Sequence, residues 1–397
     1  MRLFVRLLVL LAVAAVVVVV VPAAMATTGT LVITSSTKLA EDHHGTIVVA
    51  KNGVTLDCDG HQLVGGGAGS GVGVELLGRR SVTVTNCSVT NFDSGFHLED
   101  TRNSTLRANV AASNHLSGFD LYGSSSNTIV GNRSDSNAVH GFSSVGGGNN
   151  TLKGNSASSN RHTGFNLIDS DTNTVVENDS TGNGDHGFDT TGSRGNVLAQ
   201  NSAMSNGLVG IALSASSSDN VIKQNVVSGN LDHGILLLDA SNNTIDGNTA
   251  SDNASSGIAL GSSFGNTVKG NSSSGNGQSG FTIVESNANT LSDNSAHDNE
   301  AVGIDFIGAS GNVLTASTAS SNGIIGIALS GNATGNVLRG NIASGNGEYG
   351  IVIWPSAANN LIKQNTALTN GVFDAVEDGA GPGNEWVDNT FVTTFGI

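Results

Sequence analysis

The amino-acid sequence predicts an all-β fold: a single-stranded right-handed parallel β-helix, a solenoid in which each rung takes about 23 residues and contains three short strands. Three observations lead to this prediction. Glycine recurs at a nearly constant interval, apolar residues alternate with other residues after each glycine, and asparagine occupies three columns in the rest of the repeat. A solenoid grows along one axis, so 397 residues need not divide into several globular domains.

The glycine column sets the length of the repeat. From Gly95 to Gly350 the interval between column glycines is about 23 residues, and only the steps to Gly234 and Gly350 are longer. The full column is Gly73, Gly95, Gly118, Gly141, Gly164, Gly187, Gly210, Gly234, Gly257, Gly280, Gly303, Gly326 and Gly350. So regular an interval indicates that each unit is one turn of the same structure.

An apolar residue follows each column glycine, and a second one usually lies two positions later. Five consecutive units place phenylalanine first: Phe96, Phe119, Phe142, Phe165 and Phe188. Alternation with a period of two is typical of a short, half-buried strand. We therefore predict that the five rings stack inside the rod and that the intervening side chains face solvent.

The remainder of each unit reads Asn-x-apolar-x-x-Asn-x-x-x-x-Asn, as in Asn243, Ile245, Asn248 and Asn253. We expect each asparagine at a bend between strands, because asparagine tolerates left-handed backbone angles. Its stacked amides can also hydrogen-bond along the axis. Ser317 is an exception to one of the three columns.

Other solenoids fit this repeat less well. Each unit is rich in Ser, Asn and Gly, which are poor helix formers, and it lacks the several leucines of a leucine-rich repeat. Strands about 4.8 Å apart in about fourteen rungs would form a rod about 65 Å long. Right-handed coiling is the expected hand.

The two ends depart from the repeat. We expect residues 27–50 to form an N-terminal cap and residues 51–397 to form the β-helix domain. Near the C-terminus, Asn384, Trp386 and Asn389 restore the asparagine pattern as a capping rung. Caps are expected because the terminal strands of a solenoid present unpaired edges.

Residues 1–26 have the pattern of a secretory signal peptide. Arg2 and Arg6 precede an apolar run from Leu7 to Val21, and Ala24-Met25-Ala26 offers a cleavage site. The alternative is an uncleaved anchor, although Pro22 ends the run short of the about 20 residues that a spanning helix needs. We expect a secreted protein, extracellular or periplasmic in the cell envelope, with no membrane span after cleavage.

The chain has two cysteines, Cys58 and Cys87, in neighbouring early rungs. Cysteine pairs in exported proteins are often bridged, so we favour one disulfide at the N-terminal end. The alternative is two buried thiols.

The charge balance narrows the class of partner. The formal net charge is −16, with 16 basic and 32 acidic residues, which disfavours nucleic acid as a ligand. It also disfavours a bare polyanionic polysaccharide, unless Ca²⁺ bridges it. Solubility outside the cell would by itself account for the charge. We expect a monomer.

The outward columns of the glycine-apolar strand carry the candidate chemistry. They are polar and ionisable in the N-terminal half of the rod and contain fewer such residues beyond it. The predicted surface cleft consists of His97, Glu99, Asp120, Tyr122, His140, His186 and Asp189. Histidine and tyrosine can move protons, and aspartate can orient a base or bind a cation. The alternative is an ordinary solvated surface.

The spacing of these residues assigns no catalytic group and no metal ligand. Asp120 and Asp189 are three rungs apart, about 14 Å, too far for a paired-carboxylate hydrolase. The ten histidines include no tight spacing that marks a metal site. Imidazoles and carboxylates are suitable metal ligands, and calcium is the cofactor considered on these residues alone.

The segment Gly53-Val54-Thr55-Leu56-Asp57-Cys58-Asp59-Gly60-His61 and the repeats that follow resemble the NosD-type right-handed β-helix family, within the pectin-lyase-like group. The resemblance covers about residues 45–390. It implies the β-helix fold and either an accessory role in copper-site assembly or action on carbohydrate, and it adds copper to the cofactors considered. Gly118-Phe119-Asp120-Leu121-Tyr122 is similar to a strand of mannuronan epimerases, without its Pro and His.

Two classes of function follow. The first is a secreted protein that binds, or also processes, a polysaccharide or cell-envelope glycan along its outer face; a lyase or epimerase would belong here. The second is a non-catalytic surface or accessory scaffold, such as a NosD-type copper-site accessory protein. Whether the protein is an enzyme is left open.

Overall fold

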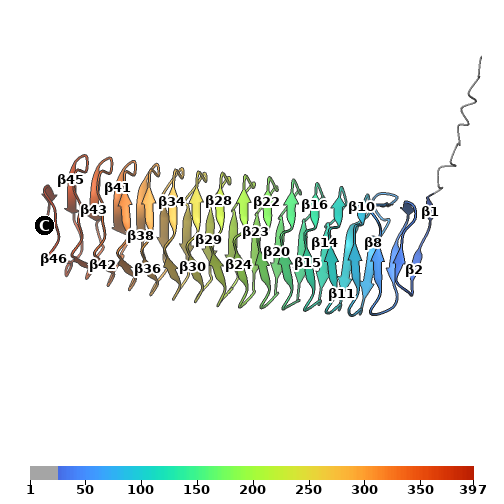
Figure 1. The fold of residues 1–397 in the computed structure, drawn as a ribbon. Coiled ribbons are helices and arrows are strands. Elements are labelled where there is room, and N and C mark those ends of the chain that lie inside the picture. The colour runs from blue at the N-terminus through green and yellow to red at the C-terminus, as the bar shows by residue number, and fades with distance from the viewer. Residues whose placement is uncertain (1–25) are drawn as a thin grey trace, which may run out of the picture.

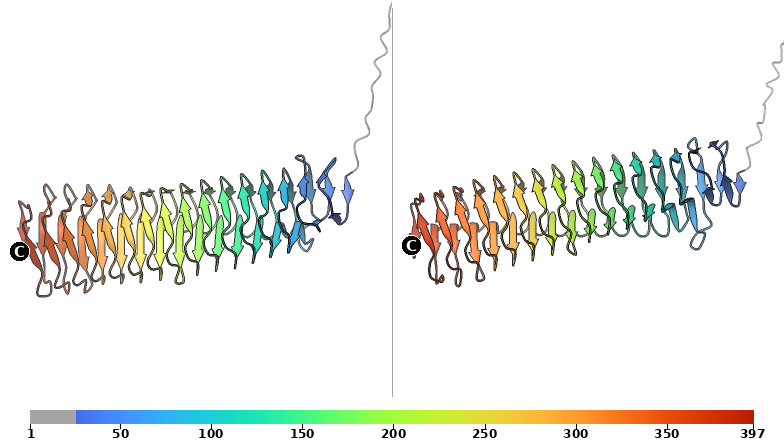
Figure 2. Two further views of the ribbon diagram at one scale, coloured as in Figure 1. Left: turned by 60° about the horizontal axis from the view of Figure 1, so that its bottom comes forward. Right: turned by 90° about the horizontal axis from the view of Figure 1, so that it is seen from below.

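The computed structural model describes residues 26–397, which form a long, slender rod of stacked β-strands (Figure 1). Two further views show the same succession of turns from one end of the rod to the other (Figure 2). In this described part of the chain, no helix has the length and apolar character needed to cross a membrane. The predicted signal peptide lies outside the described residues, except for Ala26.

Most turns add one strand to each of three parallel sheets, called A, B and C here, and the last turns continue sheet A only by isolated bridges. Sheet A has 14 strands and sheet C has 16. In sheet B, every strand from β2 to β47 likewise pairs in parallel with its counterpart one turn away. The predicted fold class, a parallel β-helix of regular rungs with three short strands each, is therefore confirmed.

Sheet A contains β1 (Thr27–Thr28), β4 (His43–His44), β7 (Gln62–Val64), β10 (Ser88–Thr90), β13 (Val110–Ala112), β16 (Arg133–Asp135), β19 (Ser156–Ser158), β22 (Asp179–Thr181), β25 (Ser202–Met204), β28 (Val226–Ser228), β31 (Thr249–Ser251), β34 (Ser272–Ser274), β37 (Ser295–His297) and β40 (Thr318–Ser320).

Sheet B contains β2 (Leu31–Ile33), β5 (Ile47–Val49), β8 (Val72–Leu77), β11 (Ser94–Glu99), β14 (Phe119–Tyr122), β17 (Phe142–Val145), β20 (Phe165–Ile168), β23 (Phe188–Thr191), β26 (Ile211–Ser214), β29 (Ile235–Leu238), β32 (Ile258–Gly261), β35 (Phe281–Val284), β38 (Val302–Ile307), β41 (Ile325–Ser330), β43 (Tyr349–Ile353), β45 (Phe373–Glu377) and β47 (Thr394–Phe395).

Sheet C contains β3 (Thr37–Lys38), β6 (Thr55–Asp57), β9 (Thr83–Thr85), β12 (Thr105–Arg107), β15 (Thr128–Val130), β18 (Thr151–Lys153), β21 (Thr174–Val176), β24 (Val197–Ala199), β27 (Val221–Lys223), β30 (Thr244–Asp246), β33 (Thr267–Lys269), β36 (Thr290–Ser292), β39 (Val313–Thr315), β42 (Val337–Arg339), β44 (Leu361–Lys363) and β46 (Glu385–Val387).

The rod has more turns than the glycine column indicates, because chain segments with a different spacing also join the sheets. Leu31 of β2 pairs with Ile47 of β5, and Ile47 pairs with Val74 of β8, so the first of these two turns is much shorter than the second. Residues 27–50 therefore extend sheets A, B and C at the N-terminal end. Strand pairing tolerates uneven loops, since only the strands must align.

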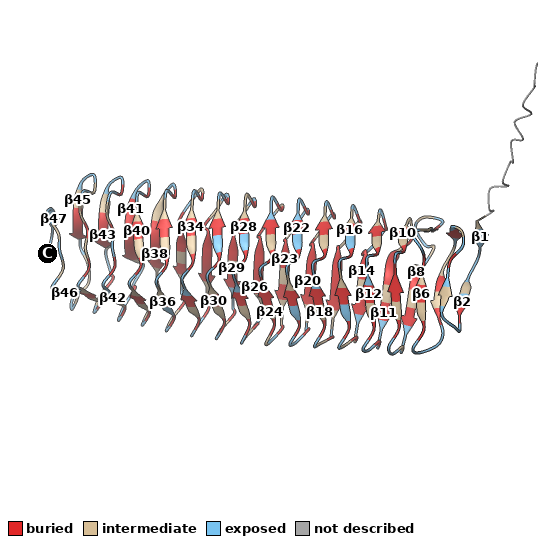
Figure 3. Cartoon of the chain, in the orientation of Figure 1, coloured by how far each residue is buried: buried red, intermediate tan, exposed pale blue. Residues whose placement is uncertain are grey.

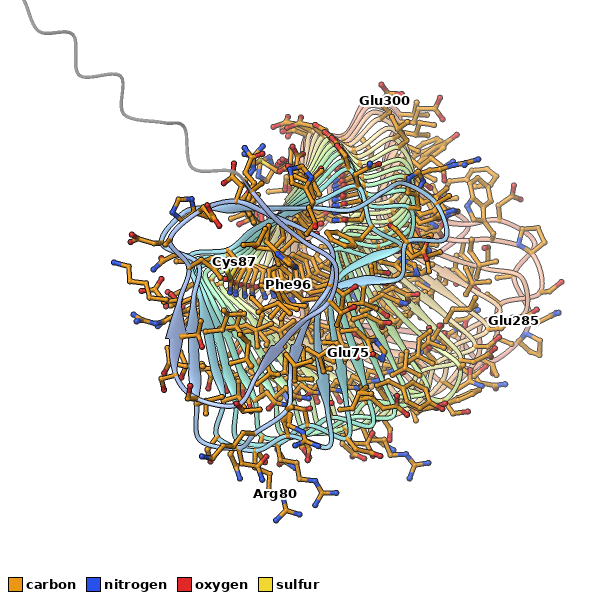
Figure 4. All side chains as sticks on the ribbon, turned by 90° about the vertical axis from the view of Figure 1, so that its right-hand side faces the viewer. Glu75, Arg80, Cys87, Phe96, Glu285 and Glu300 are labelled. Atoms are coloured by element: carbon orange, nitrogen blue, oxygen red, sulfur yellow. A yellow bond between two sulfur atoms is a disulfide. The ribbon has the colours of Figure 1, made fainter. Side chains whose placement is uncertain are left out.

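The interior of the rod holds apolar side chains together with many buried asparagines and serines. Buried residues recur along the strands of successive turns (Figure 3). The rings of Phe96, Phe119, Phe142, Phe165 and Phe188 stack with centroids 4.6–4.8 Å apart, as predicted. In the view along the axis, Phe96 lies inside the rod, whereas Arg80, Glu285 and Glu300 project from its surface (Figure 4). Aromatic stacks of this kind contribute about 0.5–1.5 kcal/mol per pair beyond the area that they bury.

The three asparagine columns are buried hydrogen-bonded ladders. The side chain of Asn243, for example, donates from Nδ2 to Oδ1 of Asn266 on the next rung (3.3 Å) and to the carbonyl of Ser217 on the previous rung (3.1 Å). The Asn266 Oδ1 atom also accepts the backbone N–H of Asn243 at 2.8 Å. Each ladder thus satisfies backbone groups at bends where no strand pairing is available.

The reason predicted for asparagine at the bends was wrong in one respect. The residue with a left-handed backbone is the one directly before each ladder asparagine, such as Gly131 (φ 62°) before Asn132 or Asp252 (φ 56°) before Asn253. The ladder asparagines themselves do not have positive φ. Asparagine is therefore required for its amide, and the preceding residue makes the bend.

The column glycines are required by close packing and not by unusual backbone angles. A methyl group on Gly95 would lie 2.6 Å from the carbonyl oxygen of Gly118 and 2.9 Å from Cβ of Ala111. The chain at this point passes against the inner face of sheet A, so any side chain would collide with it.

Local contacts join neighbouring turns near both ends of the rod. At the C-terminus the Trp386 indole donates to the Glu377 carboxylate at 2.7 Å, and Trp386 packs edge-on against Phe391. At the N-terminal end, Cys58 and Cys87 are joined by a disulfide between adjacent turns, with Cα atoms 4.7 Å apart. Both cysteines are buried.

Candidate functional site

The outer face of sheet B carries the predicted polar column in consecutive rungs. His97 pairs with Asp120, Asp120 with Ser143, Ser143 with Asn166, and Asn166 with Asp189. The neighbouring strand residues Phe96 and Leu98 are buried, whereas His97 is half-buried and Glu99 is exposed. This alternation directs His97 and its column to the outside of the rod.

The first group in this column contains His97, Asp120, Glu99 and Tyr122. His97 Nδ1 lies 3.2 Å from Asp120 Oδ2, and His97 Nε2 lies 3.7 Å from Glu99 Oε2. The hydrogen bond to Asp120 raises the pKa of His97, and the negative charges of Asp120 and Glu99 act in the same direction. Tyr122 lies opposite Glu99 on the next strand and is exposed.

The second group is centred on His140, which directly precedes Gly141. His140 Nε2 lies 3.3 Å from Nδ2 of Asn166, so its ring leans over the outer column of sheet B. Burial lowers the pKa of His140, and the Nδ1 atom has no hydrogen-bond partner among the described residues. The adjacent His162 ring is 6.1 Å away, and His162 Nδ1 lies 2.6 Å from the carboxylate of Asp185.

The third group contains His186 and Asp189. His186 Nδ1 accepts the backbone N–H of Val209 at 3.3 Å, so the neutral ring carries its proton on Nε2. Thr191 donates to Asp189 at 3.3 Å. Burial raises the pKa of Asp189, while the nearby His186 opposes that rise.

The structure therefore arranges the predicted residues as three groups along the outer face of sheet B, in which the intervening Ser143 and Asn166 are buried. His97, Glu99 and Asp120 are in contact, and Tyr122 stands beside them. His140 lies near the middle of the column, and His186 lies with Asp189 further along. Two pockets, of about 250 and 360 Å³, lie towards the two ends of the rod and are lined by other residues.

Three residues of this face were not among those predicted. Asn166 belongs to the same outward column, so alternation could have included it. His162 and Asp185 each lie two positions before a column glycine, one rung apart. That shared position in the repeat was the available signal for their contact, but alternation alone does not give the direction of side chains in a bend.

The candidate residues do not gather a metal-binding set. In the part of the chain that the structure describes, no three His, Cys, Asp or Glu side chains lie close enough to hold a metal ion. In the closest imidazole pair, Asp185 occupies one nitrogen of His162, and one nitrogen of His140 is buried. The described residues thus do not fit a copper or calcium centre within this chain.

A solenoid of parallel sheets, a ladder at each bend and an ordered outward column define this chain as a parallel β-helix protein. The family model described as right-handed β-helix region matches residues 162–290 and 265–391. The chain belongs to this right-handed β-helix family. Residues 32–206 match the model described as periplasmic copper-binding protein (NosD), which confirms the predicted NosD-type resemblance.

Several solved structures resemble this chain in fold. One is the periplasmic alginate epimerase AlgG, with 17% identity, a TM-score of 0.46 and alignment over 92% of this chain and 77% of that one. A second is the A-module of mannuronan C-5 epimerase AlgE6 from Azotobacter vinelandii, with 18% identity, a TM-score of 0.42 and coverage of 89% and 91%.

A third is the catalytic unit of a GH87 α-1,3-glucanase from Streptomyces thermodiastaticus, with 15% identity, a TM-score of 0.36 and coverage of 93% and 64%. Comparison with the curated proteins gives no match.

Proposed function

We propose that this chain is an exported β-helix protein that binds a polysaccharide or cell-envelope glycan along the outer face of sheet B. The observation that carries the proposal is the column of His97, Asp120, Asn166 and Asp189, in register along one face of the rod. An extended polymer can follow such a face, because its hydrogen-bonding groups also repeat along one axis.

The chemistry of the column suits sugar hydroxyls. Imidazoles, carboxylates and amides are donors and acceptors that can bind a hydroxyl from either side. The side chains of His97 and Asp120 are 22% and 30% exposed, so they are oriented by their neighbours yet open to a ligand. The groups are spread along a face and not gathered in a pocket, which favours a chain of several sugars over a single small molecule.

Export is supported by the signal-like segment at residues 1–26 and by the disulfide. We propose an extracellular or periplasmic location in the cell envelope and a monomeric state. Sedimentation of the mature chain tests the monomeric state.

A second candidate is a NosD-type accessory role in copper-site assembly. The match of residues 32–206 to the periplasmic copper-binding protein model favours it, because that stretch contains His97, His140, His162 and His186. The described residues do not converge on an ion, so such a role would rest on contact with a partner protein and not on a copper site in this chain.

The test is a glycan array on the mature chain, followed by titration of each polymer that binds and by an assay for its products. We expect saturable binding that His97→Ala and Asp120→Ala each weaken at least tenfold, with an unchanged circular dichroism spectrum. His297→Ala is the matched control, because His297 also lies beside an aspartate (Asp298, 2.9 Å) but on sheet A.

Absence of binding across uronate and neutral polymers would reject the carbohydrate role and leave the accessory role. Release of products would add catalysis, which is not part of the proposal.

A further inference from the structure

Beyond the polar column, the outer face of sheet B becomes apolar towards the C-terminal end of the rod. From β26 onwards, most of its outward side chains are aliphatic. They are Ala212, Leu236, Leu238, Ala259, Val284, Ile307, Ala328, Val352 and Val376. Of these side chains, Ala212, Ala259, Ala328, Val352 and Val376 are buried, whereas Leu236, Val284 and Ile307 are partly exposed and Leu238 is exposed. Apolar side chains that stay open to solvent on several successive rungs indicate an interaction surface.

Aromatic residues cover the last part of this face. Tyr349, Trp354 and Phe373 pack, half-buried, on a cluster that includes Val352 and Val376 and is separate from the main core. Tyr349 lies opposite Phe373 on the next strand. The rings of Tyr349 and Trp354 have centroids 6.1 Å apart and are nearly perpendicular, at 89°.

Polar side chains interrupt the apolar face at a few positions. Thr282 and Asp305 occupy the same outward column on successive rungs, and Ala328 follows on the next. The Thr282 hydroxyl lies 2.8 Å from that of Ser256. Among the described residues, no side chain hydrogen-bonds to the Asp305 carboxylate. Burial is the cause of the raised pKa of this group. A half-buried acceptor without a partner is a group that a ligand hydroxyl could satisfy.

The face has acids but no lysine or arginine. No described strand of sheet B contains Lys or Arg, whereas Glu75, Glu99, Asp120, Asp189 and Asp305 all lie on it. From β26 onwards the described strands of sheet B also contain no histidine, so a polyanion would meet no opposite charge on this part of the face. A purely apolar ligand, such as an acyl chain, would leave Asp305 without a hydrogen bond in an apolar setting, which is unfavourable.

The remaining ligand chemistry is a sugar without charge. Pyranose rings have apolar faces of C–H groups and a rim of hydroxyls, and aromatic rings have electron-rich faces that attract C–H groups. Isolated hydrogen-bonding groups in an apolar site orient such a ligand. Asp305 lies five rungs from Asp189 in the same column, about 24 Å, so one extended chain can reach both.

We propose that the stretch from Thr282 to Phe373 is a second subsite for the same glycan, in which Tyr349, Trp354 and Phe373 contact uncharged sugar rings and Asp305 bonds a ring hydroxyl. The inference rests on the proposed function and specifies its substrate class: a neutral polysaccharide and not a polyuronate.

The test titrates wild-type mature protein with neutral polymers (a β-glucan, an α-glucan and a mannan) and with polyuronates (alginate and polygalacturonate). We expect binding of a neutral polymer only. Trp354→Ala should weaken it at least tenfold and Asp305→Ala several-fold. Phe264→Ala is the matched control, because Phe264 is 44% exposed but lies outside the strands of sheet B.

A second readout does not depend on removing a packed ring. In a Trp386→Phe background, Trp354 is the one remaining tryptophan of the sequence, and its fluorescence should change on titration with the neutral polymer. Trp354→Phe should keep most of the affinity, since a ring face remains.

The outcomes separate this inference from the proposed function. Loss of binding in His97→Ala, with Trp354→Ala and Asp305→Ala unaffected, would reject the second subsite alone. Preference for polyuronates would reject the neutral substrate class. Concentration-dependent dimers that Trp354→Ala abolishes would show that a second copy covers this face, and would also reject the subsite. No binding of any polymer by the wild type would reject both proposals.

Discussion

The imidazole of His97 and the carboxylate of Asp120 lie on successive turns of the rod, with Nδ1 and Oδ2 3.2 Å apart. Because the hydrogen bond to Asp120 raises the pKa of His97, the pair stabilises the fold fully below the ordinary histidine pKa of about 6.5. This contribution is lost as the pH rises through the raised pKa.

Asp120→Asn should lower the pKa of His97, because the amide cannot balance the imidazolium charge. An NMR titration of the imidazole resonances measures this change. Asp298→Asn, which alters an aspartate on the other side of the rod beside His297, should leave the His97 titration unchanged. An unaltered His97 titration in Asp120→Asn would contradict the structural contact.

Ser317 interrupts the second asparagine ladder. The Asn294 backbone N–H donates to Ser317 Oγ at 3.2 Å, but the Asn294 amide reaches only the Val268 carbonyl and has no ladder partner. Ser317→Asn should restore the missing bond and raise the free energy of unfolding by about 1 kcal/mol. Denaturant unfolding measures this change in the free energy of unfolding.

The reverse change, Asn248→Ser in the intact part of the ladder, should destabilise by about 1–3 kcal/mol, because it leaves buried groups unpaired. Equal stability of both variants and the wild type would mean that the ladder contributes little.

The phenylalanine stack should be sensitive to truncation. Phe142 lies between Phe119 and Phe165 and is 1% exposed, so Phe142→Ala should cost about 3–5 kcal/mol of unfolding free energy. Phe264→Ala, at an exposed position, should change stability by less than about 0.5 kcal/mol. Similar losses in the two variants would argue against a continuous stack.

Asp305 should make the fold less stable at neutral pH than at acid pH. Burial raises its pKa from 3.8 to about 6, so the folded chain holds a proton that the unfolded chain has already lost between these values. The resulting loss of stability as pH rises from about 4 to 6 is at most about 3 kcal/mol.

Asp305→Asn should remove this pH-dependent loss and raise the unfolding midpoint at neutral pH relative to the wild type. Near the ordinary aspartate pKa the two chains should be nearly equal. Urea unfolding at both pH values measures the difference, and a parallel pH dependence in the two chains would refute the assignment to Asp305.

The disulfide should stabilise the N-terminal rungs. It joins residues 29 positions apart, and closing a loop of that size in the unfolded chain is worth about 3–4 kcal/mol in the chain-entropy model. Replacing Cys58 and Cys87 with Ser and Ala should lower the melting temperature. Hydrogen exchange should rise first near β6 and β9. A uniform rise in exchange along the rod would contradict a local stabilisation by the disulfide.

The sequence by itself determined the repeat and hence the fold. Alternation within each strand separates His97 and Glu99 from Phe96 and Leu98, and the repeat interval places His97 next to Asp120. Both follow from pleating and strand pairing, which act between positions that the repeat makes equivalent. The outward column of sheet B could therefore be predicted without coordinates.

Only the tertiary structure decided what happens in the bends and at the ends. Side-chain direction in a bend depends on local backbone angles, so the contacts of His140 with Asn166 and of His162 with Asp185 were not predictable from alternation. The left-handed residue proved to be the neighbour of each ladder asparagine. Residues 27–50 joined the sheets despite their uneven spacing, because strands that pair need matching faces and not equal loops.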